Sequence, residues 1–128
     1  SNLFAVQSLR QLSKLYEQLK GDNEFAAICA NFAQEVEDAI QQFGIVEHPV
    51  HGRIYAYEVD GFGNALFMDD ANVPSLLSLP YLGFVDADNP TYKRTRALLL
   101  DEESNPWYRL RRSIACSLAV RVCAGFAL

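Results

Sequence analysis

The sequence predicts a mainly α-helical chain in which two helices form a hairpin and a short β-hairpin or loop insertion interrupts the helical pattern. Two observations support this. Apolar residues recur every three or four positions through most of residues 2–43, which is the period of one face of an α-helix. Between residues 48 and 89 this period gives way to short apolar runs separated by glycine, proline, asparagine and aspartate.

The first predicted helix runs from Asn2 to Leu19. Gly21 ends it, and Asp22 and Asn23 offer caps to the next helix. The second predicted helix runs from Glu24 to Phe43, with Gly44 as its stop. Two long helices joined by a short turn form an αα-hairpin, a pattern that would also begin a four-helix bundle. The expected apolar stripes comprise Ala5, Leu9, Leu12, Tyr16 and Leu19 in the first helix and Phe25, Ile28, Cys29, Phe32, Val36, Ile40 and Phe43 in the second.

The pattern changes after Gly44. Residues 48–52 form a turn-rich connection, and the alternation from Arg53 to Val59 predicts a short strand. Further on, Asn72 with Pro74 indicates a helix start, which Pro80 ends within two turns. A second asparagine–proline start, Asn89-Pro90, predicts a helix to about Leu100.

Composition excludes several classes of protein. Half of the 128 residues are hydrophobic and 21% are charged, as in ordinary globular domains. A net charge of −5 argues against nucleic acid or an anionic membrane as partner, and no apolar run reaches the roughly 18–20 residues of a membrane helix. Three cysteines without regular spacing predict neither a disulfide framework nor a zinc site.

The segment from Arg53 to Phe84 is rich in aromatic side chains beside aspartates and asparagines. Aromatic faces pack on the C–H faces of a sugar ring, and carboxylates and amides bind its hydroxyls, so the segment is a candidate carbohydrate site. Tyr57 and Tyr81 are the tyrosines we assign to it.

Two groups of polar residues in this segment have alternative interpretations. Either Asp69, Asp70 and Asn72 all bind sugar hydroxyls, or Asn72 or Asp70 caps a helix and its neighbours are solvated. Their spacing lacks the pattern of a calcium loop. Asp60 and Asn64 flank the Gly61-x-Gly63 loop and either form the opposite wall of the same pocket or stabilise a β-turn.

A metal site is not predicted. His48 and His51 lie beside Glu47, but a zinc site there would need a further ligand and a regular geometry that Pro49 disfavours. No cofactor is expected either.

The strings Asp60-Gly-Phe-Gly-Asn64 and Met68-Asp-Asp-Ala-Asn-Val-Pro-Ser-Leu-Leu-Ser-Leu-Pro-Tyr-Leu-Gly83 closely resemble a segment of glycoside hydrolase family 125, the metal-independent α-mannosidases. The resemblance implies part of an (α/α)6 barrel, whose twelve helices need at least roughly 200 residues. The chain is therefore expected to be an internal fragment. Residues 1–108 would be the central part of a catalytic domain.

Residues 109–128 form a tail in which the resemblance is no longer visible. They hold four of the 11 basic residues and none of the 16 acidic ones. We expect a divergent or out-of-frame end, with an amphipathic helix as the competing interpretation.

The resemblance implies an inverting exo-α-1,6-mannosidase that acts on mannose-terminated glycans. It places the general acid, an aspartate, just before Ser1 and the general base, a glutamate, well after Tyr108, so no catalytic residue is assigned within the chain. Glu58 stands in the predicted strand beside the glycine loop and receives no role.

The rival hypothesis is a non-catalytic helical carbohydrate-binding or interaction module. The sequence indicates no cellular compartment or oligomeric state. By resemblance, the substrate wall would comprise Asp60, Asn64, Asp69, Asp70 and Asn72, with Tyr57 and Tyr81 in support.

Overall fold

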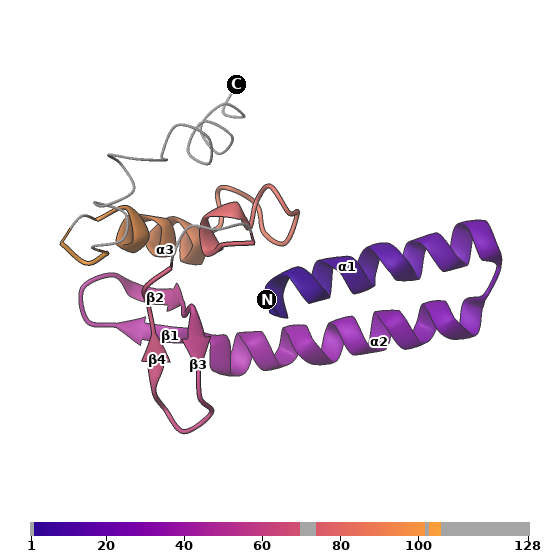
Figure 1. Cartoon of the computed structure of the whole chain (residues 1–128), viewed down its shortest axis with the longest axis horizontal. Coiled ribbons are helices and arrows are strands. Elements are labelled where there is room, and N and C mark those ends of the chain that lie inside the picture. The colour runs from indigo at the N-terminus through magenta and orange to yellow at the C-terminus, as the bar shows by residue number, and fades with distance from the viewer. Residues whose placement is uncertain (1, 70–73, 102, 106–128) are drawn as a thin grey trace.

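The computed structural model describes residues 2–69, 74–101 and 103–105. A long helical hairpin extends to one side, and two small sheets and a third helix lie at its other end (Figure 1). In chain order the elements are α1 (Asn2–Leu15), η1 (Tyr16–Lys20), α2 (Asn23–Ala39), η2 (Ile40–Gly44), β1 (Ile45–His48), β2 (Gly52–Tyr55), β3 (Glu58–Val59), β4 (Ala65–Leu66), η3 (Leu76–Ser78) and α3 (Pro90–Leu100).

The helical hairpin confirms the two predicted helices. Each ends in a wider, π-type turn, η1 after α1 and η2 after α2. Gly21 takes a left-handed conformation, with φ of 65°, at the end of the first helix. The Asp22 carboxylate accepts a hydrogen bond of 3.0 Å from the Phe25 N–H, which caps the second helix. The turn therefore follows from residues that lie next to one another in the sequence.

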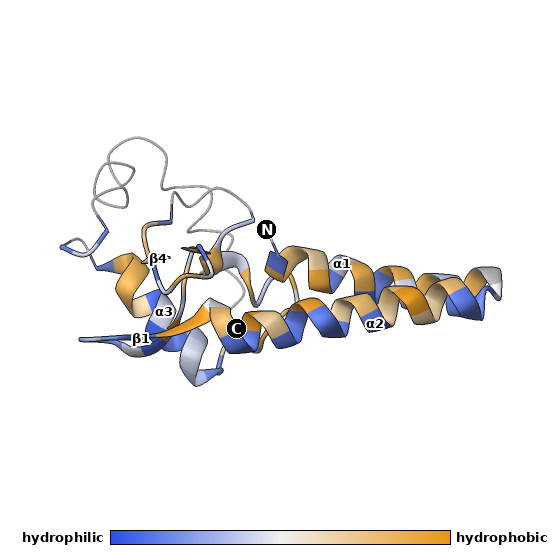
Figure 2. Cartoon of the chain, turned by 90° about the horizontal axis from the view of Figure 1, so that it is seen from below, coloured by the Kyte–Doolittle hydropathy of each residue, from blue (hydrophilic) through white to orange (hydrophobic). Residues whose placement is uncertain are grey.

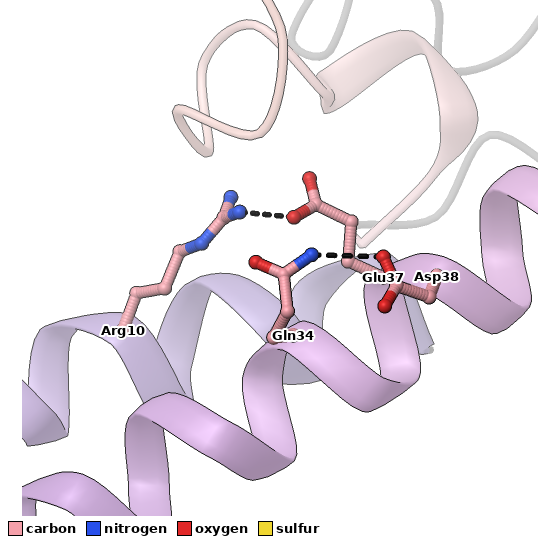
Figure 3. A network of polar contacts seen from close by, with 4 residues as sticks. All are labelled: Arg10, Gln34, Glu37 and Asp38. Atoms are coloured by element: carbon pink, nitrogen blue, oxygen red, sulfur yellow. Dashed lines mark hydrogen bonds and ion pairs between the residues drawn. The ribbon is translucent and has the colours of Figure 1, made fainter.

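Polar contacts join the two helices along the hairpin. The Ser13 hydroxyl donates to the Ala26 carbonyl oxygen at 2.8 Å. Arg10 of α1 reaches across to form an ion pair with Glu37 of α2 (Figure 3). A partly exposed ion pair of this kind contributes roughly 0–1 kcal/mol, so packing rather than charge holds the helices together.

The buried face of α2 matches the predicted stripe only in part: Cys29 is buried as predicted, and Val36 packs against the core. The residues that face α1 are small and recur at helical spacing: Ala26, Cys29 and Ala33 are buried. Ile28 and Phe32, which the apolar pattern placed inside, are 57% and 53% exposed. Small side chains let two helices approach closely, and this approach turns the larger apolar residues of α2 outward.

The strand predicted from Arg53 to Val59 is divided between two antiparallel hairpins. Its first half belongs to β2, which pairs with β1 so that Tyr55 lies opposite Ile45. Its second half is β3, which pairs with β4. The change of partner occurs at one position: the Ala56 N–H donates to Gly44, and the next N–H, that of Tyr57, donates to Leu66. Sequence alternation could not show that the partner changes.

Helix α3 begins and ends as predicted. The Asn89 side chain accepts hydrogen bonds from the Thr91 and Tyr92 N–H groups, and Pro90 occupies the first turn. The other predicted start, at Asn72, lies outside the described residues. The described helical turn in that region is η3, which begins after Ser75 in a reciprocal capping box with Ser78.

The hydrophobic core lies where the end of the helical hairpin meets β2, η3 and α3. Fully buried Thr95 links two of these elements, because its hydroxyl accepts the Tyr55 N–H at 2.9 Å and donates to the Thr91 carbonyl. The apolar core residues are Val6, Ala33, Ile40, Tyr55, Leu76, Leu79, Phe84, Tyr92 and Leu99.

Away from the strands, the hairpin carries apolar side chains that no other described part of the chain covers. Leu19, Ile28 and Phe32 are exposed, and apolar segments alternate with polar ones along both helices (Figure 2). None of the helices in the part of the chain described is both long enough and apolar enough to cross a membrane. A cluster of large exposed apolar side chains marks a surface that binds other protein or aggregates.

We therefore expect the isolated 128-residue chain to aggregate, or to unfold without a cooperative transition, because these side chains remain in water. Size-exclusion chromatography with light scattering, followed by a thermal melt, tests this. A monomer with one sharp two-state transition would contradict it.

Candidate functional site

A hollow of about 680 Å³ lies between the start of α1, the end of the second helix, β3 and η3. Its lining is largely apolar, and four segments contribute aromatic residues: Phe4 from α1, Phe43 from η2, the buried Tyr55 from β2, and Tyr57 just before β3. Two carboxylates, Glu35 of α2 and Glu58 of β3, also line it. Aromatic rings beside hydrogen-bond acceptors are suited to a polyhydroxylated ring.

The Asp60 side chain organises the loop between β3 and β4. One carboxylate oxygen accepts hydrogen bonds from the Phe62 and Asn64 N–H groups at 2.8 and 3.0 Å, and the other accepts the Asn64 side-chain amide at 2.5 Å. The Asn64 amide, followed by these backbone donors, lowers the pKa of Asp60 below its usual value. Gly61 and Gly63 supply the positive φ values, 76° and 102°, that the tight turn requires.

Asp69 is 2% exposed and fixes the start of η3. Its Oδ2 accepts the Leu76 N–H at 2.7 Å. Behind it, the buried Asn105 amide donates to the carbonyl oxygens of Asp69 and Leu99, at 3.4 and 3.2 Å. Asp69 is thus a buried acceptor that connects η3 with the end of α3; it is neither the cap of η3, which is Ser75, nor a solvated neighbour of a cap. Asp70 and Asn72 lie outside the described residues.

The structure brings together only part of the predicted substrate wall. Tyr57 lines the hollow, as does Gly61 of the glycine loop. Asp60, Asn64, Asp69 and Tyr81 do not line it, and the Tyr81 side chain is largely exposed. The sequence did not single out Phe4, Phe43 and Glu35, which line the hollow, because each fits an amphipathic helix and no local signal distinguishes it.

A second, smaller hollow of about 450 Å³ opens between α2, β2 and the segment before α3. Its lining is mostly polar and includes Glu37, Arg53, Asn89 and the buried Tyr55. Burial raises the pKa of the Tyr55 phenol; the Gln41 side chain partly offsets this, and the Glu37 charge adds to it. The phenol is therefore a neutral hydrogen-bonding group at physiological pH.

Within the described residues, no three His, Cys, Asp or Glu side chains are grouped as metal ligands. His48 has a structural role there: its Nδ1 accepts the Val50 and His51 N–H groups in the turn between β1 and β2, at 3.2 and 3.3 Å. That nitrogen is engaged by the backbone.

The chain is similar to known proteins along most of its length. The model of a family described as metal-independent alpha-mannosidase (GH125) matches residues 1–117, which include the first part of the tail. The meiotically up-regulated gene 157 protein of Schizosaccharomyces pombe is 50% identical over 108 residues, 84% of this chain and 21% of that protein.

A solved structure shares the fold as well as the sequence. It is that of a metal-independent α-mannosidase from Streptococcus pneumoniae in a non-productive complex with α-1,6-mannobiose. It is 38% identical with a TM-score of 0.74, over 82% of this chain and 25% of the other. The chain thus spans between a fifth and a quarter of the lengths of these two relatives. With a family match over residues 1–117, the chain belongs to the metal-independent α-mannosidases of glycoside hydrolase family 125.

Proposed function

We propose that the chain is part of an inverting, metal-independent exo-α-1,6-mannosidase that removes mannose from the ends of glycans. The observation that carries this proposal is the family match over residues 1–117. The Streptococcus pneumoniae relative, which shares the fold at 38% identity, was solved with α-1,6-mannobiose, and this supports a mannose-containing substrate.

The exposed apolar side chains of the hairpin support the proposal of a larger fold. In an (α/α)6 barrel, further helices would pack against both helices of the hairpin and cover Leu19, Ile28 and Phe32. The excess of uncovered apolar surface is therefore what one unit of such a barrel would show.

The 680 Å³ hollow is the place where this part of the enzyme would meet the sugar. Asn2, Leu3 and Phe4 line it, and they directly follow the segment in which the resemblance places the general acid. Tyr57 and Gly61 line it from the other side. We propose that the segments 57–64 and 69–81 form a wall of the subsite beside this hollow. Its polar and aromatic residues would be Tyr57, which lines the hollow, and Asp60, Asn64, Asp69, Asp70, Asn72 and Tyr81, which would extend the wall beyond the lining described above.

An inverting glycosidase uses two carboxyl groups roughly 6.5–9.5 Å apart. The acid protonates the departing oxygen while the base activates a water on the opposite face of the ring. In this proposal the chain supplies neither group. Its residues hold the terminal mannose between them, and Asp60 and Asp69 fix the loops that do so.

For the reaction itself, we expect the full-length protein to hydrolyse α-1,6-mannobiose at the same rate in the presence of a chelator, with β-mannose as the first-formed product, because inversion changes the anomer. Proton NMR of the anomeric signals during turnover measures both. The isolated 128-residue chain should show no turnover. Initial release of α-mannose, or loss of activity in the chelator, would contradict this mechanism. Sugar binding without turnover by the full-length protein would instead favour a non-catalytic binding module.

For the wall residues, we expect Asp70→Ala in the full-length protein to lower kcat/KM about tenfold to a hundredfold. This corresponds to a charge-assisted hydrogen bond of about 1.5–3 kcal/mol. Asp69→Ala should in addition lower the melting temperature, because the buried Leu76 N–H loses its acceptor. Asp69→Asn is the matched control, since its amide oxygen can still accept that bond.

Melting temperature and kcat/KM are measured on the same samples of each variant. If the two alanine variants melt at lower temperature yet retain wild-type kcat/KM per folded molecule, residues 69–72 are structural and the assignment of this wall is wrong.

A further inference from the structure

Glu58 is a charged residue that lines the hollow and has no role among those described above. It begins β3, where it lies opposite Leu66 of β4. The hairpin that carries it is fixed on both sides: the Tyr57 N–H donates to the Leu66 carbonyl at 2.8 Å, and the Asp60 N–H donates to the Asn64 carbonyl at 3.3 Å. The backbone position of Glu58 is therefore set before any ligand arrives.

The carboxylates of Asp60 and Asp69 accept hydrogen bonds from backbone N–H groups, whereas the carboxylate of Glu58 does not. Asp60 accepts bonds within its loop, and Asp69 accepts the Leu76 N–H. The side chain of Glu58 forms no hydrogen bond or ion pair with the described residues, and the residue is exposed and lines the hollow. Its two oxygens are thus available as acceptors.

The residues that line the hollow around Glu58 indicate what kind of ligand it can bind. Its described lining contains no lysine, arginine or histidine, so nothing there would compensate an anionic ligand beside Glu58 and Glu35. Phe4 and Phe43, which are 45% and 53% exposed, present apolar rings on the same hollow as Tyr57. A neutral ring with hydroxyl groups on its edge and C–H groups on its faces satisfies both kinds of lining.

We propose that Glu58 is a sugar-binding residue whose carboxylate accepts hydrogen bonds from hydroxyl groups of a mannose unit held against the aromatic side chains of this hollow. The inference rests on the proposed function. The contact between Glu58 and a sugar hydroxyl is additional, because Glu58 is not among the residues of the predicted wall.

The test uses the full-length protein with α-1,6-mannobiose as substrate. Glu58→Ala removes both acceptors, and Glu58→Gln keeps the size of the side chain but removes the charge. We expect kcat/KM to fall about tenfold to a hundredfold in Glu58→Ala and by a smaller factor in Glu58→Gln. The melting temperature should stay at the wild-type value, because no folded-state hydrogen bond is lost. Glu17→Gln, an exposed glutamate of η1 at the far end of the hairpin, is the control and should change neither quantity.

Wild-type kcat/KM in both Glu58 variants would overturn the inference. So would a fall in melting temperature with unchanged kcat/KM per folded molecule, because it would give Glu58 a structural role. If the wild-type protein shows no turnover at all, the proposed function is wrong, and the role of Glu58 has to be tested separately. Calorimetric titration with mannose then tests Glu58 alone: equal affinity of wild type and Glu58→Ala would overturn its role in binding.

Discussion

The packing of β2 against α3 supports the strand that leads to the hollow, and one buried hydroxyl joins the two elements. Thr95 is fully buried, accepts the Tyr55 N–H and donates to the Thr91 carbonyl. Both hydrogen-bonding capacities of the hydroxyl are therefore used in a place where an unpaired group would cost about 1–3 kcal/mol. Because Tyr55 also belongs to the apolar core, this contact fixes the strand that leads to Tyr57 and Glu58.

Four of the described aspartates accept hydrogen bonds from backbone N–H groups. Asp22 caps α2, Asp60 closes the β3–β4 turn, and Asp69 holds the start of η3. A fourth, Asp101, accepts the Glu103 N–H and the Ser104 hydroxyl just after α3, and these bonds, that of Ser104 first, lower its pKa. A short carboxylate side chain reaches nearby backbone donors easily, so an aspartate-rich segment builds turns as readily as it binds a ligand. The longer side chain of Glu58 forms no such contact within the described residues.

The two ends of the helical hairpin are under different constraints. At the end near the strands, Ile40 packs into the core together with Tyr55 and Leu79. At the other end, Leu19 and Ile28 stay in contact with water although they lie on apolar stripes. The hairpin is therefore anchored at the end that carries the hollow, and its remaining apolar faces are suited to packing against further helices.

The sequence alone determined the turn of the helical hairpin and the start of α3, because both depend on residues within about four positions. Gly21 with Asp22 and Asn89 with Pro90 act as predicted, since a cap or a left-handed glycine needs only its immediate neighbours. The family was also evident from the local string around Asp60 and Met68, and the family match confirms it.

Tertiary structure decided which faces are buried, which strands pair, and which residues share the hollow. The small residues of α2 determine which face of that helix packs against α1. The backbone changes its hydrogen-bonding partner between two neighbouring residues, since Ala56 donates to Gly44 and Tyr57 donates to Leu66. Phe4, Phe43 and Tyr57 meet in the hollow although about forty residues separate the first from the second. Contacts between segments so distant in the chain arise only when the core forms, because no local rule of spacing or capping connects them.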